Sequence, residues 1–122
     1  SSARPRTGGR EDLRPGARLF ADGHFFEAHE VWEAVWKALP VGEERRAIQG
    51  LIHLAVALEH RRRGSLRSAA GQWAKAKDKL ENGCPGVPFD LAAVLVAVGP
   101  CLDAAERGNT VDIPELGRYN PE

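Results

Sequence analysis

The stretch that decides the fold is residues 47–58, which read AIQGLIHLAVAL. Apolar side chains occupy nearly every position, so a helix built from them has almost no polar side. A helix that is apolar on all sides is buried on all sides. The segment therefore predicts a central helix, over about residues 43–63, with the other helices packed around it.

Shorter helical patterns lie on both sides of this segment. Helices are expected over residues 14–21 and 25–39, and the second must stop there because the residue before Pro40 disfavours helical angles. Ser65 and Asp90 are suitable N-caps for two further helices. We find no alternation typical of strands. The sequence predicts an all-α fold, a compact bundle of five or six helices around one central apolar helix.

The last of these helices contains a proline, and the ends of the chain differ from the helical pattern. Pro100 lacks a backbone donor, so the helix that begins near Asp90 should kink or break near Gly99. Residues 1–12 carry Arg, Gly, Ser and Pro and little to bury, which predicts a disordered basic arm. Residues 13–122 are predicted to form one helical-bundle domain, whose tail from about residue 109 lies extended across it.

Composition limits the class of protein. The formal net charge is zero, with 17 basic and 17 acidic residues, which argues against a domain that mainly coats nucleic acid or an anionic membrane. The two cysteines, Cys84 and Cys101, lie far apart and belong to no CxxC pair, so neither a zinc ribbon nor a disulfide framework is indicated. The longest apolar run, residues 91–99, is far shorter than the roughly 20 residues of a membrane span. We therefore expect a cytoplasmic protein without a signal peptide or membrane segment, either a monomer or a homodimer.

Polar side chains interrupt the most aromatic helix. Residues 25–36 read FFEAHEVWEAVW. On a wheel of about 100° per residue, His29 and Glu33 fall inside the aromatic stripe, one turn apart, and Glu30 lies near its edge. Because His29 and Glu33 are predicted to lie in a buried stripe, each needs a polar partner.

The central helix carries a matching polar ridge, made by Gln49, His53 and His60. A short link joins the two helices, so we expect them to pack antiparallel. An unpaired buried polar group costs about 1–3 kcal/mol, which favours two polar seams that face each other. We predict one polar cluster, made of His29, Glu33, Gln49 and His53, with Glu30 and His60 at its margins.

Three roles for this cluster remain open: a structural hydrogen-bond network, a small-ligand or metal pocket, and a catalytic site. His29 and Glu33 could chelate a metal, with His53 as a third ligand. The HEVWE segment resembles the HExxH zinc signature, but Glu33 replaces its second histidine. For acid–base chemistry Glu33 would orient His29, yet no serine or cysteine lies on a matching face. The sequence identifies no cofactor and leaves open whether the protein is an enzyme.

A second candidate site is basic. Arg61, Arg62, Arg63 and Arg67 surround the turn after the central helix. Cations at a helix C-terminus commonly stabilise that end and stay solvated. The alternative function is contact with phosphate or RNA, which would weaken steeply with salt.

The paired motifs resemble DUF309, a bacterial and archaeal domain of unknown function. The resemblance covers about residues 13–106 and rests on these residues: Ala28, His29, Glu30, Glu33, Trp36, Gln49, Gly50, Leu51, Ile52, His60 and Gly64. It implies a compact bundle with one central helix, and it supplies no reaction. If the motif marks a site, the resemblance implies that His29, Glu30, Glu33, Gln49 and His60 carry it.

Three functions are therefore compatible with the sequence. The first is a module that binds a small molecule or a protein through the polar cluster. The second is a metal-dependent, hydrolase-like enzyme that uses the same residues. The third is an RNA-associated protein that uses the basic run from Arg61 to Arg67.

Overall fold

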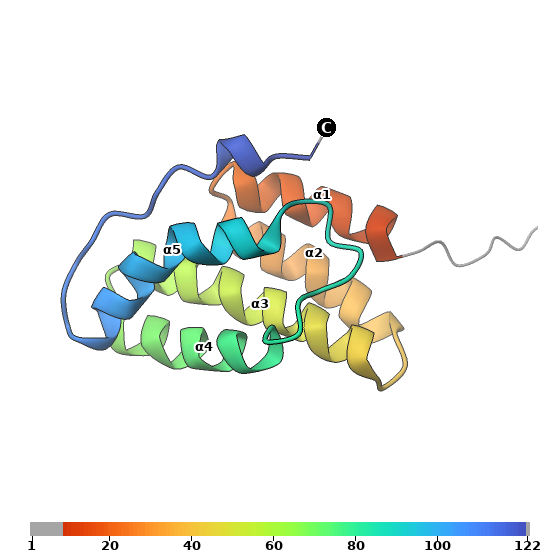
Figure 1. Ribbon diagram of the computed structural model, residues 1–122, viewed down its shortest axis with the longest axis horizontal. Helices are drawn as coiled ribbons and strands as arrows, with labels where there is room; N and C mark the ends of the chain where they lie inside the picture. The colour runs from red at the N-terminus through yellow and green to blue at the C-terminus, as the bar shows by residue number, and fades with distance from the viewer. Residues whose placement is uncertain (1–8, 122) are drawn as a thin grey trace, which may run out of the picture.

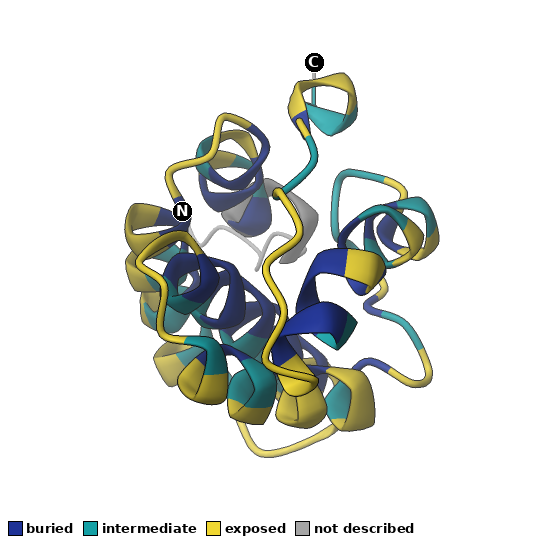
Figure 2. Ribbon diagram, turned by 90° about the vertical axis from the view of Figure 1, so that its left-hand side faces the viewer, coloured by how far each residue is buried: buried dark blue, intermediate teal, exposed yellow. Residues whose placement is uncertain are grey.

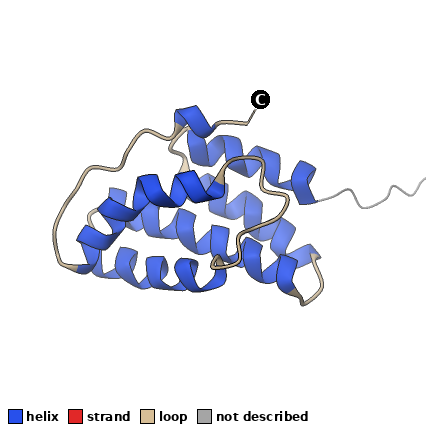
Figure 3. Cartoon of the chain, in the orientation of Figure 1, coloured by secondary structure: helices blue, strands red, loops and turns tan. Residues whose placement is uncertain are grey.

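A computed structural model describes residues 9–121, with side chains from residue 13 onward. Helices and loops make up this whole part of the chain, and no strand occurs in it (Figures 1 and 3). The prediction of an all-α fold is confirmed. The helices are α1 (Gly9–Ala21), α2 (Phe25–Ala38), α3 (Glu43–Arg62), α4 (Leu66–Lys79), α5 (Leu91–Glu106) and the short 3-10 helix η1 (Gly117–Tyr119).

Helix α3 is the central helix, as its apolar sequence predicts. It packs against α2, α4 and α5, whereas α1 packs mainly against α2. Buried ribbon lies at the inside of the bundle and exposed residues face outward (Figure 2). The fully buried large side chains of α3 are Ile48, Leu51, Leu54 and Leu58.

Aromatic residues form the contact between α1 and α2. The indole of Trp32 is fully buried, and its Nε1–H donates to the carbonyl oxygen of Leu13 at 3.2 Å. The ring centroid of Phe20 lies 5.6 Å from that of Trp32 and 5.4 Å from that of Phe25. Gly16 makes this packing possible, because a Cβ there would come within 2.4 Å of Trp32 Nε1.

A close crossing also joins α3 and α4. A Cβ on Gly50 would lie 2.7 Å from Leu80 Cγ and 3.1 Å from Lys79 Cβ. The glycine in the middle of α3 therefore lets α4 approach, which offsets its cost of about 1 kcal/mol in a helix.

One sequence prediction about helix limits is wrong. Residues 9–12 were predicted to belong to a disordered arm, but they form the first turn of α1. Buried Leu13 and Ala17 anchor this helix, and each residue added to an existing helix gains one backbone hydrogen bond. The rest of that arm lies outside the described residues. Helix α5 runs through Pro100 without a break, and the alternative of a kink near Gly99 stays a prediction. Val96, whose carbonyl loses its usual partner, is exposed, so water can solvate that oxygen.

The tail after α5 crosses the bundle and is fixed at several points. Arg61 Nη2 donates to the carbonyl oxygen of Val111 at 2.7 Å. Leu116 is buried in the core, and Asn120 Nδ2 donates to Asp22 Oδ1 at 2.9 Å. The return of the tail toward α1 is visible in Figure 1.

Candidate functional site

The two histidines of the motif segments meet in one pocket between the start of α2 and the end of α3. His29 and His60 line it together with Phe26 and Val56, and Glu59 and Arg63 complete the lining. The volume is about 220 Å³. Antiparallel packing of α2 and α3 explains the pairing, because the first turns of α2 then lie beside the last turns of α3.

One hydrogen bond sets the tautomer of His29. Its Nδ1 lies 2.9 Å from the carbonyl oxygen of Phe26. A carbonyl can only accept, so Nδ1 carries the proton and donates it. The neutral imidazole then has an unprotonated Nε2, which can accept a hydrogen bond.

A buried acid lies beside the two imidazoles. Glu59 is only 5% exposed, and its carboxylate accepts from Arg62 Nη2 at 2.7 Å and from Arg63 Nε at 2.6 Å. Burial, the largest single influence, would raise the pKa of Glu59. The hydrogen bonds and charges of Arg62 and Arg63 together outweigh it, so the pKa lies below its ordinary value. The pocket therefore borders an ion cluster in which Glu59 and Arg63 belong to the lining and Arg62, outside the lining, adds one positive charge.

The structure does not bring the other predicted members of the polar cluster into this pocket. Glu30 is exposed, and Glu33 is half-buried without a hydrogen bond or ion pair among the described residues. Gln49 lines a separate hollow near the end of α2. The prediction that His29, Glu33, Gln49 and His53 satisfy one another is therefore wrong.

His53 turns toward α4 instead of α2. Its Nδ1 donates to Gln72 Oε1 at 2.7 Å, since an amide oxygen can only accept. Burial is the main cause that lowers the pKa of His53; Lys75 and Lys79 lower it further, and the bond to Gln72 opposes them. His53 is thus a structural link between α3 and α4.

The lowered pKa of His53 predicts a pH dependence of stability. An unfolded histidine titrates near pH 6.5, so as the pH falls the unfolded chain takes up this proton first. The contribution of His53 to the free energy of unfolding is present above that pH and is lost as the pH falls toward the folded pKa, at no more than about 1.4 kcal/mol per pH unit. Urea unfolding between about pH 7.5 and 5 measures this slope. We expect His53→Gln to flatten the slope; equal slopes in wild type and His53→Gln would contradict the assignment.

The chemistry available to a catalytic or metal site is limited by these positions. Within the part of the chain that the structure describes, no three His, Cys, Asp or Glu side chains lie close enough to hold a metal ion. The candidate trio of His29, Glu33 and His53 is therefore not assembled. Both cysteines are buried free thiols. Burial, aided by the charge of Glu44, raises the pKa of Cys84 to about 12, and burial also raises that of Cys101, so neither is a thiolate near neutral pH.

The basic run does not form one exposed surface. Arg61 is only 8% exposed, because its guanidinium reaches under the tail to bind Val111. Arg62 and Arg63 are exposed but bind Glu59, and Arg67 is exposed. Arg61 therefore offers little surface to a partner, because its Nη2 binds the tail, and contact of the basic run with phosphate or RNA stays a prediction.

Sequence reasoning missed Glu59 and Gln72. The signal for Glu59 was present, because Arg62 and Arg63 follow it at the i+3 and i+4 spacing that brings side chains together on a helix. Gln72 gave no such signal, since its partner His53 lies on another helix.

Fold and site together define a helical bundle with a small histidine-lined pocket between two antiparallel helices. Across the described residues, no helix has both the length and the apolar character to cross a membrane. Residues 13–72 match the family model of a domain of unknown function, DUF309, and this part of the chain belongs to that family. The match confirms the resemblance carried by the sequence motifs.

The chain is also similar to a bacterial protein. An uncharacterized protein of Aquifex aeolicus is 30% identical over 112 residues, which are 90% of this chain and 32% of the relative. The chain thus spans about a third of the length of that relative. No solved structure matches the chain.

Proposed function

We propose that this protein is a ligand-binding module, and that the pocket of His29 and His60 binds a small carboxylate with an apolar body. The observation that carries the proposal is the convergence of both histidines on one pocket beside the Glu59 ion cluster. A pocket of about 220 Å³ is smaller than the roughly 300–1,000 Å³ of sites for drug-sized molecules. The ligand must therefore be small.

The charges of the site favour an anionic group. Glu59 and Arg63 line the pocket and pair with each other, and Arg62, outside the lining, gives the cluster a net charge of one positive. His60 offers a hydrogen bond from its imidazole, and His29 offers one when its Nε2 is protonated. A carboxylate fits this set of donors better than an ammonium group does.

The apolar wall favours an aliphatic or aromatic body. Phe26 is 47% exposed, although it is among the largest apolar side chains of the protein, and Val56 lies in the same pocket. An apolar group held between them would be removed from water, which contributes about 25 cal/mol per Å².

Titration with benzoate and hexanoate, each beside its neutral amide, tests the proposal. We expect both acids to bind and to shift the imidazole NMR signals of His29 and His60, and the amides to bind at least about tenfold more weakly. His29→Ala and His60→Ala should each lower the affinity about tenfold with the helical fold retained. His24→Ala is the matched control, since His24 precedes the same helix but lies outside the pocket. Failure of both acids to bind, or equal affinity in His29→Ala and His24→Ala, would overturn the proposal.

A further inference from the structure

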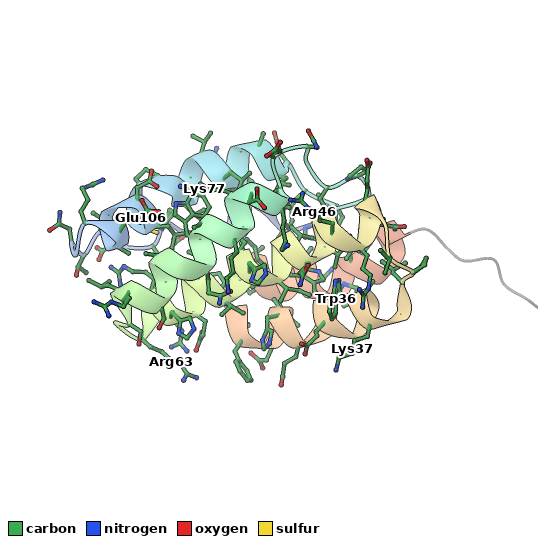
Figure 4. The ribbon with its side chains drawn as sticks, turned by 90° about the horizontal axis from the view of Figure 1, so that it is seen from below. Trp36, Lys37, Arg46, Arg63, Lys77 and Glu106 are labelled. Atoms are coloured by element: carbon green, nitrogen blue, oxygen red, sulfur yellow. The ribbon has the colours of Figure 1, made fainter. Side chains whose placement is uncertain are left out.

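A second hollow lies at the opposite end of the α2–α3 pair. Its volume is about 450 Å³, and its lining comes from the end of α2, the start of α3 and the end of α4: Trp36, Val41, Gly42, Glu43, Arg45, Arg46, Gln49 and Lys79. Trp36 and Arg46 lie on the half of the molecule away from Arg63, which marks the histidine pocket (Figure 4). The two hollows are therefore separate.

An unpaired donor lies beside this hollow. Trp36 Nε1 is buried and has no hydrogen-bond partner among the described residues. The other two indoles are paired, Trp32 with the Leu13 carbonyl oxygen and Trp73 with Asp103 Oδ1 at 2.8 Å. A buried donor without an acceptor costs about 1–3 kcal/mol, so an acceptor that reaches it gains that amount.

Three cations from two helices line the same hollow. Arg45 lies over the ring of Trp36 at 4.0 Å and donates Nε to the Trp36 carbonyl oxygen at 3.2 Å, and this leaves its Nη groups unbonded among the described side chains. Arg46 is held by Asp78 at 3.0 Å. Lys79 has no ion pair within the described part of the chain and is brought in by the close crossing at Gly50.

The balance of charge selects the class of ligand. Glu43 is the one acid in the lining, and Asp78, which lies outside the lining, already pairs with Arg46. Arg45 and Lys79 are left without an ion pair among the described residues, so a phosphate dianion matches these two cations, whereas a single carboxylate leaves one of them uncompensated. The hollow is also larger than a phosphate group, and Val41, which is 90% exposed, offers an apolar contact at its edge.

We propose that this hollow binds the phosphate monoester group of a small molecule. Arg45, Arg46 and Lys79 contact the oxyanion, Trp36 Nε1–H and the Gln49 amide are its neutral donors, and Val41 contacts the organic part. Because Trp36 Nε1 is buried, the arginine and lysine side chains of the lining must move to open a path to it, while the indole stays packed against the core. The site is independent of the histidine pocket.

The three indole N–H signals in a ¹H–¹⁵N NMR spectrum provide the test. Inorganic phosphate and phenyl phosphate are titrated separately at constant ionic strength. We expect the Trp36 signal to move downfield and saturate with both, and phenyl phosphate to bind several-fold more tightly. The Trp32 and Trp73 signals are internal controls that should stay in place, since their donors are already bonded.

Two matched variants complete the experiment. Lys79→Gln should weaken phenyl phosphate about tenfold, whereas Lys37→Gln, which removes an exposed lysine of α2 outside the hollow, should have no effect. His29→Ala should also leave phosphate binding intact, which separates this site from the carboxylate pocket. An unmoved Trp36 signal, a shift that does not saturate, or equal losses in the two lysine variants would overturn the proposal.

Discussion

Replacing Trp32 by alanine should lower the free energy of unfolding by about 3–5 kcal/mol, because the change removes the largest fully buried side chain of the protein. The indole fills the contact between α1 and α2, touches Phe20 and donates to the Leu13 carbonyl oxygen. Its loss leaves a cavity and removes this hydrogen bond. Since domains of this size have about 5–15 kcal/mol in total, the variant should be close to unfolding.

Urea unfolding followed by circular dichroism measures this loss, and two variants separate its causes. Trp32→Phe keeps most of the apolar volume and should lose less than Trp32→Ala. Trp36→Phe is the matched control on the same helix, because that indole is half-buried and its Nε1–H has no partner to lose. A loss in Trp32→Ala no greater than in Trp36→Phe would contradict the packing described here.

The central helix could be predicted from sequence because its signal is local. A run of apolar residues that leaves no polar side specifies burial on every side whatever the neighbours are. The cap at Asp90 is local in the same way, and its Oδ1 accepts from the Ala93 backbone N–H at 3.1 Å. A glycine inside an apolar helix likewise indicates a close helix contact, and Gly50 lies where α4 approaches α3.

The grouping of the polar residues could not be predicted in the same way. A helical wheel gives the direction of a side chain on one helix but not which neighbour it meets. His53 and His60 lie on the same face of α3, yet His53 forms a hydrogen bond with Gln72 of α4, whereas His60 lines the pocket between α2 and α3. Position along the antiparallel pair separates them, since two turns of helix displace a side chain by about 11 Å.

The two sites also depend on contacts that no single segment specifies. The sequence around Arg61 suggests an exposed side chain, but the C-terminal tail covers it. Helices α4 and α5 separate that tail from Arg61 along the chain. Lys79 reaches the hollow of Trp36 because Gly50 lets α4 approach α3. Tertiary packing therefore decides which charges stay free to bind a ligand, and the sequence pattern supplies only the candidates.

Replacing Gly16 by alanine should also destabilise the protein, by about 1–3 kcal/mol. The new Cβ would lie 2.4, 2.6 and 2.8 Å from three atoms of the Trp32 indole, which is rigid and fully buried and so cannot yield cheaply. This cost exceeds the gain of up to about 1 kcal/mol that alanine brings to a helix. Gly71→Ala is the matched control, because a Cβ at that position of α4 meets nothing within 4 Å and should stabilise the protein slightly.

A double-mutant cycle between Gly16→Ala and Trp32→Leu isolates the cause of this loss. In the Trp32→Leu background the indole is absent, so Gly16→Ala should become neutral or stabilising by up to about 1 kcal/mol. Urea unfolding of the four proteins gives the coupling free energy directly. An equal cost of Gly16→Ala in both backgrounds would mean that the contact with Trp32 does not set it, and that the α1–α2 packing differs from the arrangement described here.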